Sequence, residues 1–289
     1  MKQLLILSGK GGTGKTTIAS AFISLSKARA YADCDVDAPN LHLITEWESA
    51  PESSDFYGLP KAEIDKDICV ECDICRQHCR FDAIKADPEY EIDIYACEGC
   101  GVCEYVCPAG AIKMTPHVAG ELMLYTDFEK VFSTAQLKMG SGTSGLLVSE
   151  VKKRMKNAVK EDVGFAIIDG SPGIGCPVIA SLSGVDMVLI VAEPSLSGIS
   201  DMERIIDTAK KFGVKIAVCV NKYDTNLKNT EKIESFCREN KFPNLGRIPF
   251  DTEAVKAVNS GKTIADIDCE SGRAVKEVYK NTMEMLLEI

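Results

Sequence analysis

The 289-residue sequence predicts an α/β fold: a doubly wound, mostly parallel sheet that is interrupted by one small α+β insertion. Two observations support this prediction. Short apolar segments alternate with amphipathic stretches over most of the chain, a pattern that is typical of a parallel sheet covered by helices on both faces. Between about residues 60 and 116 the alternation stops, and cysteines, acidic residues and short turns replace it.

The elements follow in order along the chain. The strands are expected at Leu4–Leu7, Arg29–Ala32, Phe165–Ile168, Met187–Val191, Ile216–Val220 and Arg247–Pro249. Helices are expected where apolar residues recur at three- and four-residue spacing. They are Thr16–Lys27, Leu146–Val159, Ser200–Phe212, Thr230–Glu239 and Arg273–Leu287. Since strands lie on both sides of the cysteine-rich segment, we expect one discontinuous domain, residues 1–59 and 117–289, with a second domain inserted at 60–116.

Composition and charge argue against several classes of protein. The formal net charge of -10 gives no basic field for nucleic acid or anionic lipid, so we expect neither nucleic acid nor a membrane as a partner. No apolar run approaches the ~18 residues of a membrane-spanning helix, and the apolar start leads straight into a glycine-rich loop. Thirteen cysteines without an export signal indicate a reducing compartment. We therefore expect a cytoplasmic protein whose clustered cysteines bind metal.

A glycine-rich loop, Gly9-Lys10-Gly11-Gly12-Thr13-Gly14-Lys15-Thr16, lies between the first strand and the first helix. It fits G-x-x-x-x-G-K-[ST], the P-loop pattern. Backbone N–H groups of such a loop surround phosphate oxygens, while Lys15 would neutralise the β/γ charge and the Thr16 hydroxyl would bind Mg²⁺. The expected nucleotide-binding residues are Gly11, Gly12, Thr13, Gly14, Lys15, Thr16 and Thr17.

Two acidic turns follow strands whose carboxyl ends should meet this loop. Asp33, Asp35 and Asp37 crowd the turn after the second strand, where like charges need a cation or another partner to compensate them. For any one of them the alternative is an Asx-turn cap of a helix. The strand at Phe165–Ile168 ends in Asp169, and a glycine-containing turn follows. This layout of Walker B and switch II predicts that Asp169 lies in the Mg²⁺ shell.

The insertion contains two copies of one cysteine motif, each with the spacing C-x2-C-x2-C-x3-C. This spacing matches the bacterial ferredoxin run, in which the fourth cysteine binds the cluster of the other copy. A tetrahedral zinc site would not explain the triple spacing. Arg80 stands where the ferredoxin pattern has proline, whereas Pro108 is present in the second copy. The expected [4Fe–4S] ligands are Cys69, Cys72, Cys75 and Cys107 for cluster I, and Cys97, Cys100, Cys103 and Cys79 for cluster II.

The run from Lys10 to Thr16 resembles the deviant Walker A motif of the MinD/ParA group, which includes the nitrogenase iron protein. In that family the early lysine reaches the phosphates bound by the other subunit of a dimer. The resemblance therefore implies an ATP-dependent homodimer in which Lys10 acts in trans; the alternative is a lysine that contacts phosphate in cis. It also implies that Asp35 lies near the attacking water. The expected catalytic residues are Lys10, Lys15, Asp35 and Asp169.

The base side of the site is less specific. Asn221, in Asn221-Lys222-Tyr223-Asp224, resembles the adenine-side asparagine of the MinD family, but N-K-x-D is also the guanine-reading motif of GTPases, so GTP remains an alternative to ATP. Cys176 follows Asp169 at the offset of a cluster ligand in the nitrogenase iron protein. No second cysteine of that kind is evident, and an ordinary residue in a switch turn is the favoured interpretation of Cys176.

Over nearly its whole length the chain resembles MinD-superfamily ATPases with an inserted ferredoxin domain. The resemblance implies ATP, Mg²⁺ and two [4Fe–4S] clusters as cofactors, and a slow, partner-stimulated ATPase. The first hypothesis is nucleotide-dependent dimerisation coupled to electron transfer toward a partner metalloprotein or its maturation machinery. The alternatives are an iron–sulfur or metal-cofactor carrier or assembly ATPase, and a redox-sensing positioning ATPase of the MinD/ParA type. A membrane-bound version of the latter would need a basic amphipathic tail, whereas residues 273–289 mix both charges.

Overall fold

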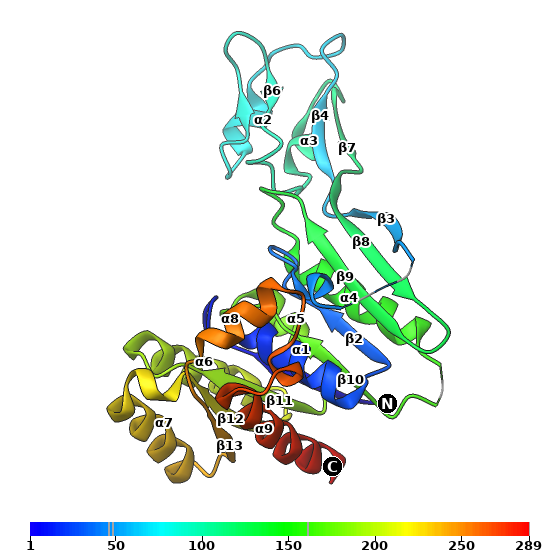
Figure 1. Ribbon diagram of the computed structural model, residues 1–289. Coiled ribbons are helices and arrows are strands. Elements are labelled where there is room, and N and C mark those ends of the chain that lie inside the picture. The colour runs from blue at the N-terminus through cyan, green and yellow to red at the C-terminus, as the bar shows by residue number, and fades with distance from the viewer. Residues whose placement is uncertain (46, 48, 161, 289) are drawn as a thin grey trace.

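The computed structural model describes residues 1–45, 47, 49–160 and 162–288. Within these residues the main body is built on a nine-stranded sheet with the order β13-β12-β11-β1-β10-β2-β9-β8-β3 (Figure 1). Its strands are β1 (Lys2–Leu7), β2 (Ala30–Asp33), β3 (Glu52–Tyr57), β8 (Val118–Thr126), β9 (Val131–Leu137), β10 (Phe165–Asp169), β11 (Met187–Ala192), β12 (Lys215–Asn221) and β13 (Asn244–Ile248).

The sheet is parallel from β13 to β9 and antiparallel at one edge, where β9 pairs with β8 and β8 with β3. Every residue of β11 is buried, as expected for a central parallel strand with helices on both faces. The predicted mostly parallel α/β sheet is thus confirmed. The antiparallel strands at the edge were not predicted. They flank the cysteine-rich segment in the sequence, where the regular alternation of strands and helices is interrupted.

Helices cover both faces of the sheet (Figure 1). They are α1 (Lys15–Ser26), α4 (Ser144–Ala158), α5 (Cys176–Leu182), α6 (Leu196–Lys210), α7 (Leu227–Glu239), α8 (Thr252–Asn259) and α9 (Glu270–Leu287). One apolar core lies under α4 to α7 and the other under α1 and α9. In the described part of the chain, none of the helices combines the length and apolar character needed to span a bilayer.

Some helix boundaries differ from those predicted. Helix α6 begins at Leu196 and not at Ser200, because the Ser195 hydroxyl accepts a hydrogen bond from the Gly198 N–H at 3.0 Å and caps the helix. Helix α7 begins at Leu227 for the same kind of reason, since the side chain of Asn226 caps it. The apolar periodicity used for prediction does not register such caps. Helices α5 and α8 are too short for that signal and were missed.

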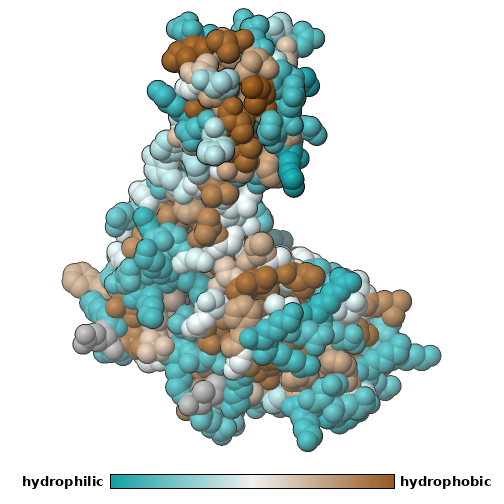
Figure 2. Space-filling view, turned by 180° about the vertical axis from the view of Figure 1, so that it is seen from behind, coloured by the Kyte–Doolittle hydropathy of each residue, from teal (hydrophilic) through white to brown (hydrophobic). Residues whose placement is uncertain are grey.

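Residues 61–115 form a separate unit, here called the cysteine-rich lobe, which projects from the end of the body that carries β3 and β8 (Figure 1). It contains β4 (Lys61–Ile64) paired with β7 (Ile112–Thr115), β5 (Ile84–Lys85) paired with β6 (Glu91–Ile92), α2 (Ile74–His78) and α3 (Val102–Val106). Its own core includes Ala62, Cys75, Ala83, Ile84, Cys97 and Ile112. Seen from behind, the molecule narrows between lobe and body (Figure 2).

Candidate functional site

The glycine-rich loop joins β1 to α1 at the carboxyl edge of the parallel strands. Gly12 and Gly14 have φ of +78° and +93°, in the left-handed region that favours glycine. A Cβ on Gly14 would lie 2.2 Å from Nδ2 of Asn221, so a larger residue does not fit there. No side chain caps α1, whose N-cap residue is Gly14. The first N–H groups of the helix therefore point toward the loop and form a site for an anion.

Three of the predicted side chains meet beneath this loop. The Lys15 ammonium lies 2.6 Å from Asp169 Oδ1, and the Thr16 hydroxyl donates to Asp169 Oδ2 at 2.6 Å. Burial alone would lower the pKa of Lys15, but attraction to Asp169, Asp33 and Asp35 outweighs it and raises the pKa above its usual value. Lys15 is therefore charged. A phosphate group and Mg²⁺ would have to compete with these contacts for Lys15, Thr16 and Asp169.

The three acids after β2 differ in their surroundings. Asp33 is fully buried, and its carboxylate accepts N–H bonds from Asp35, Asn40 and Leu41, each at 3.0 Å. Burial, assisted by Asp169, raises the pKa of Asp33 to about 7. Asp33 thus holds the turn together. Of the three, Asp35 makes an ion-pair contact with Lys15, with 3.9 Å between Oδ2 and Nζ. Asp37 is exposed.

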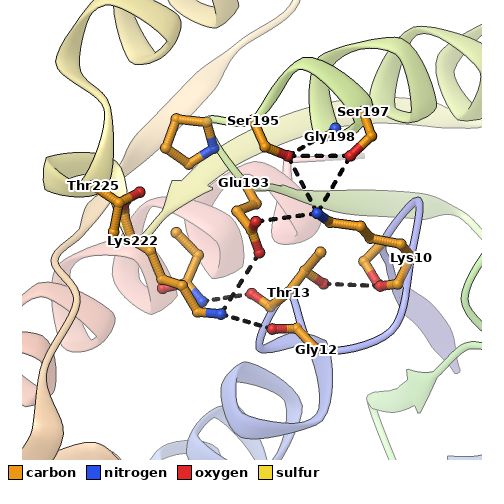
Figure 3. Close-up of polar contacts among 12 residues, drawn as sticks. Lys10, Gly12, Thr13, Glu193, Ser195, Ser197, Gly198, Lys222 and Thr225 are labelled. Carbon is orange, nitrogen blue, oxygen red and sulfur yellow. Dashed lines mark hydrogen bonds and ion pairs between the residues drawn. The ribbon is translucent and has the colours of Figure 1, made fainter.

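Lys10 points toward the turn between β11 and α6 (Figure 3). Its ammonium lies 3.2 Å from Glu193 Oε1, 3.2 Å from the Ser195 hydroxyl and 3.4 Å from the Ser197 hydroxyl. Glu193 also lies 3.6 Å from the Lys222 ammonium, so one carboxylate serves two cations. The sequence interpretation missed Glu193 and the two serines. Glu193 could have been found by its position, because it follows the end of an apolar strand just as Asp169 does.

On the other side of the loop, β12 contributes Asn221 and Lys222. The Asn221 amide donates to the Thr13 carbonyl at 2.6 Å, and the Lys222 ammonium donates to the Gly12 carbonyl at 2.7 Å (Figure 3). A cavity of about 260 Å³ opens beside them. Its lining includes Gly12, Gly14, Thr17, Ile18, Asn221, Lys222, Ile248, Pro249, Phe250, Val255 and Ile264. The cavity is largely apolar and adjoins the phosphate loop, as a site for a nucleotide base would.

The family profile described as the CobQ/CobB/MinD/ParA nucleotide binding domain matches residues 4–264. The chain belongs to this family. Its members of the MinD/ParA type are nucleotide-binding ATPases, in agreement with the phosphate loop and the acids around it. The P-loop NTPase fold that the sequence predicts is confirmed by this match.

Similar proteins cover most of the chain. An uncharacterized protein of Methanocaldococcus jannaschii is 32% identical over 288 residues, which are 98% of this chain and 97% of the relative. The septum site-determining protein MinD of Bacillus subtilis is 25% identical over 295 residues, covering 99% of this chain and 89% of MinD. The solved structure of MinD from Pyrococcus horikoshii complexed with Mg-ADP aligns with a TM-score of 0.57 and 17% identity, and covers 98% of this chain and 96% of that one. This structural likeness shows the fold.

In the cysteine-rich lobe of this family member, the eight motif cysteines surround two separate cavities. One is lined by Cys69, Cys72, Cys75 and Cys107, and the other by Cys79, Cys97, Cys100 and Cys103. Each cavity thus takes three cysteines from one copy of the motif and the fourth from the other copy. The remaining lining is mostly apolar, as with Ile64 and Ile112 in the first cavity and Ile84 and Val102 in the second.

The eight thiols differ in exposure: Cys72 and Cys100 are exposed, and the others are buried or partly buried. Burial raises the pKa of Cys75 and of Cys103, so that both hold their protons more tightly than a free cysteine does. Cys107 Sγ accepts a hydrogen bond from the Ala111 N–H at 3.3 Å. Among the described residues, no three His, Cys, Asp or Glu side chains converge as the ligands of a single metal ion would.

The five remaining cysteines lie in the body. Cys34, Cys219, Cys237 and Cys269 are buried, and burial raises the pKa of Cys34 and Cys219 to about 12. Cys176 is exposed at the first residue of α5. These positions give the buried thiols a packing role.

Proposed function

We propose that this protein is an ATP-hydrolysing iron–sulfur protein in which nucleotide-dependent dimerisation is coupled to electron transfer toward a partner metalloprotein or its maturation machinery. The observation that carries the proposal is the arrangement of the eight cysteines, three plus one around each of two apolar cavities. In this proposal residues 60–116 are an inserted ferredoxin-like domain, and residues 1–59 and 117–289 are the ATPase domain.

The donor set fits [4Fe–4S] clusters. Each thiolate of such a cluster binds a different iron, so four sulfurs are expected to surround a cavity and not to converge on one point. When bound, the clusters would supply one-electron transfer. The chain's own part is to exclude water with apolar side chains and to donate hydrogen bonds to sulfur, as the Ala111 N–H does to Cys107. Hydrogen bonds to sulfur raise the potential of a cluster, whereas the exclusion of water lowers it, because an apolar surrounding disfavours the more negatively charged reduced form.

The nucleotide site supports ATP with Mg²⁺. We assign Lys15 to the β/γ-phosphates, and Thr16 and Asp169 to the Mg²⁺ shell, because these three side chains already share contacts of 2.6 Å. The loop N–H groups of Gly11, Gly12, Thr13 and Gly14 would hold phosphate oxygens, and Thr17 lines the cavity beside them. We assign Asp35 to the attacking water, since it is the partly exposed carboxylate near Lys15.

Adenine fits the base side better than guanine. In the guanine-reading use of N-K-x-D, the final aspartate must accept hydrogen bonds from the base. Here Asp224 Oδ1 already accepts the Phe250 N–H at 2.7 Å, and Asp224 is not among the residues that line the cavity. We therefore propose ATP as the nucleotide.

Dimerisation would use Lys10. Its side chain is 36% exposed and is held in cis by one carboxylate and two hydroxyls, all at the surface side of the loop. Such a partly exposed ion pair contributes little, about 0–1 kcal/mol, so the phosphates of a second subunit can compete for the ammonium. We propose that Lys10 leaves Glu193 when two chains close around ATP.

The test is made on protein purified without oxygen. We expect about eight irons per chain, bound as two four-iron clusters, and electron transfer to an acceptor dye that differs between the ADP and the ATP-analogue states. As a control, Cys176→Ala removes an exposed cysteine that belongs to neither set and should leave the iron content unchanged. Zinc in place of iron would refute the cluster assignment, and identical acceptor kinetics in both nucleotide states would refute the coupling.

Two other functions compete with this one. A redox-sensing positioning ATPase is favoured by the match of the whole chain to MinD, and a cluster carrier is favoured by the exposure of Cys72 and Cys100, since exposed ligands make a cluster easier to release. The three functions can be distinguished by identifying the proteins that co-purify anaerobically with the chain bound to the ATP analogue. A metalloprotein that accepts electrons supports our proposal, and an apo-protein that acquires iron supports the carrier.

A further inference from the structure

A buried lysine joins the two helices next to the nucleotide site. Lys152 of α4 is 9% exposed, and its ammonium donates to three carbonyls at the end of α5 and at the residue that follows it. These are Ala180 at 3.3 Å, Ser181 at 2.6 Å and Ser183 at 2.6 Å. Burial lowers the pKa of Lys152, as expected for an ammonium that has no carboxylate partner in these contacts. Separating α4 from α5 would leave the buried ammonium without acceptors, which costs free energy. We therefore expect the two helices to move together.

The same two helices are in close contact at the opposite end. Gly145, in the first turn of α4, lies against the first residue of α5, since a Cβ on Gly145 would be 3.2 Å from the Cβ of Cys176. The pair is therefore held at both ends of α5 and can act as one rigid unit. Neither Lys152 nor Gly145 takes part in the nucleotide site described above.

The start of α5 is connected by a short segment to the nucleotide site. Helix α5 follows residues 170–175 directly, and these follow Asp169. Asp169 is held by Lys15 and Thr16 at 2.6 Å each, and nucleotide with Mg²⁺ would take both of these partners. Within residues 170–175, the Gly173 N–H donates to the Ser8 carbonyl at 3.1 Å. This hydrogen bond is a second connection between the phosphate loop and residues 170–175.

The cysteine-rich lobe is contacted near the same end of the unit, where both helices begin. Residues 138–143 connect β9 to α4 and lie against the lobe. A Cβ on Gly140 would be 2.8 Å from Cδ1 of Tyr95, and one on Gly142 would be 3.5 Å from Oε2 of Glu98. The hydroxyl of Thr143 is buried, has no hydrogen-bond partner among the described residues, and does not cap α4.

We infer that Lys152 is a positioning residue that makes α4 and α5 shift together, so that nucleotide state is passed from residues 170–175 to residues 138–143 and on to the lobe. The recipient is the cavity lined by Cys79, Cys97, Cys100 and Cys103, because Tyr95 and Glu98 flank Cys97. The inference rests on the proposed function only in taking that cavity as a cluster site. It can be tested without measuring electron transfer.

The test is hydrogen exchange on the full chain, purified with its iron, with Mg²⁺ and either ADP or a non-hydrolysable ATP analogue. We expect exchange in residues 138–143 and 95–100 to differ between the two states by about fivefold or more. In Lys152→Met the difference in both segments should disappear while the one in residues 170–175 remains. The matched control is Lys153→Met, which removes an exposed lysine paired with Glu150 and should behave as the wild type.

A second variant keeps the inference testable if Lys152→Met does not fold. Tyr95 is 70% exposed, so Tyr95→Ala should fold, keep the response of residues 138–143 and lose that of residues 95–100. Tyr105→Ala, at a lobe tyrosine that is 92% exposed, should retain both responses. The inference is overturned if the wild type shows no response at 138–143, or if folded Lys152→Met or Tyr95→Ala responds as the wild type does. Iron content of the same samples separately decides the cluster assignment.

Discussion

The body and the cysteine-rich lobe are stabilised by different means. The body buries a parallel sheet between two apolar cores, and its polar groups near the phosphate loop are paired with one another. The lobe has two-stranded sheets, helices of five residues and a small core to which Cys75 and Cys97 themselves contribute. A segment well under about 70 residues seldom buries enough apolar surface to be stable alone. We therefore expect the body to be stable through its own core, and the lobe to depend on the clusters that we propose its cysteines bind.

The largest expected effect follows from this difference. Removal of iron with a chelator should abolish hydrogen-exchange protection in residues 61–115, because ligand binding supplies the folding free energy of such small metal sites. Protection of β1, β10 and β11 should change little, since these strands are buried in the body. Hydrogen exchange before and after chelation measures both regions at once. A lobe that stays as protected as the body would show that it does not need its clusters.

The next effect separates the two lysines of the phosphate loop. Lys15→Ala removes a buried charge that contacts Asp169, and we expect nucleotide binding to weaken by about 100-fold or more. Lys10→Ala removes a half-exposed lysine whose contacts lie on the β11–α6 turn, so binding should persist while ATP-dependent dimerisation and hydrolysis are lost. Calorimetry and sedimentation with ATP measure the two properties. If the Lys10 variant still dimerises and turns over normally, Lys10 acts in cis.

A third experiment distinguishes the two proposed cluster sites of the lobe. Cys107 lines the same cavity as Cys69, Cys72 and Cys75 although it belongs to the second copy of the motif. Cys107→Ala should therefore impair that cluster and spare the other, with a loss of up to about half of the iron and of one of two electron paramagnetic resonance signals. Cys79→Ala is the reciprocal change and should spare the cluster held by Cys69. Loss of the Cys97 cluster in the Cys107 variant would contradict the crossed assignment.

Local patterns in the sequence single out side chains that the structure brings together. The phosphate loop and the two cysteine motifs are local patterns, and the apolar strand before Asp169 places that acid at the sheet edge. Glu193 and Lys152 were not predicted, because their importance comes from contacts with residues far along the chain, Lys10 and the end of α5. From the sequence alone, Lys152 would be taken for a solvated helix residue. The fold shows that it lies on the side of α4 that α5 covers.

The smallest expected effect concerns Glu193, whose carboxylate contacts both Lys10 and Lys222. It lies 3.2 Å from Lys10 and 3.6 Å from Lys222, and its side chain is 20% exposed. If Lys10 must leave Glu193 to reach a second subunit, Glu193→Gln weakens the contact that holds it back, and ATP-dependent dimerisation should become tighter. Because such pairs contribute about 0–1 kcal/mol, the gain should not exceed roughly fivefold for each of the two lysines that a dimer releases.

Sedimentation of Glu193→Gln at several protein concentrations with the ATP analogue measures this gain. Glu231→Gln changes an exposed glutamate of α7 by the same chemistry and should leave the dimerisation constant unchanged. Higher salt should reduce the difference between Glu193→Gln and the wild type, since it screens the ion pair that the variant lacks. Weaker dimerisation of the Glu193 variant would mean that Glu193 supports Lys10 in the dimer and does not restrain it in the single chain.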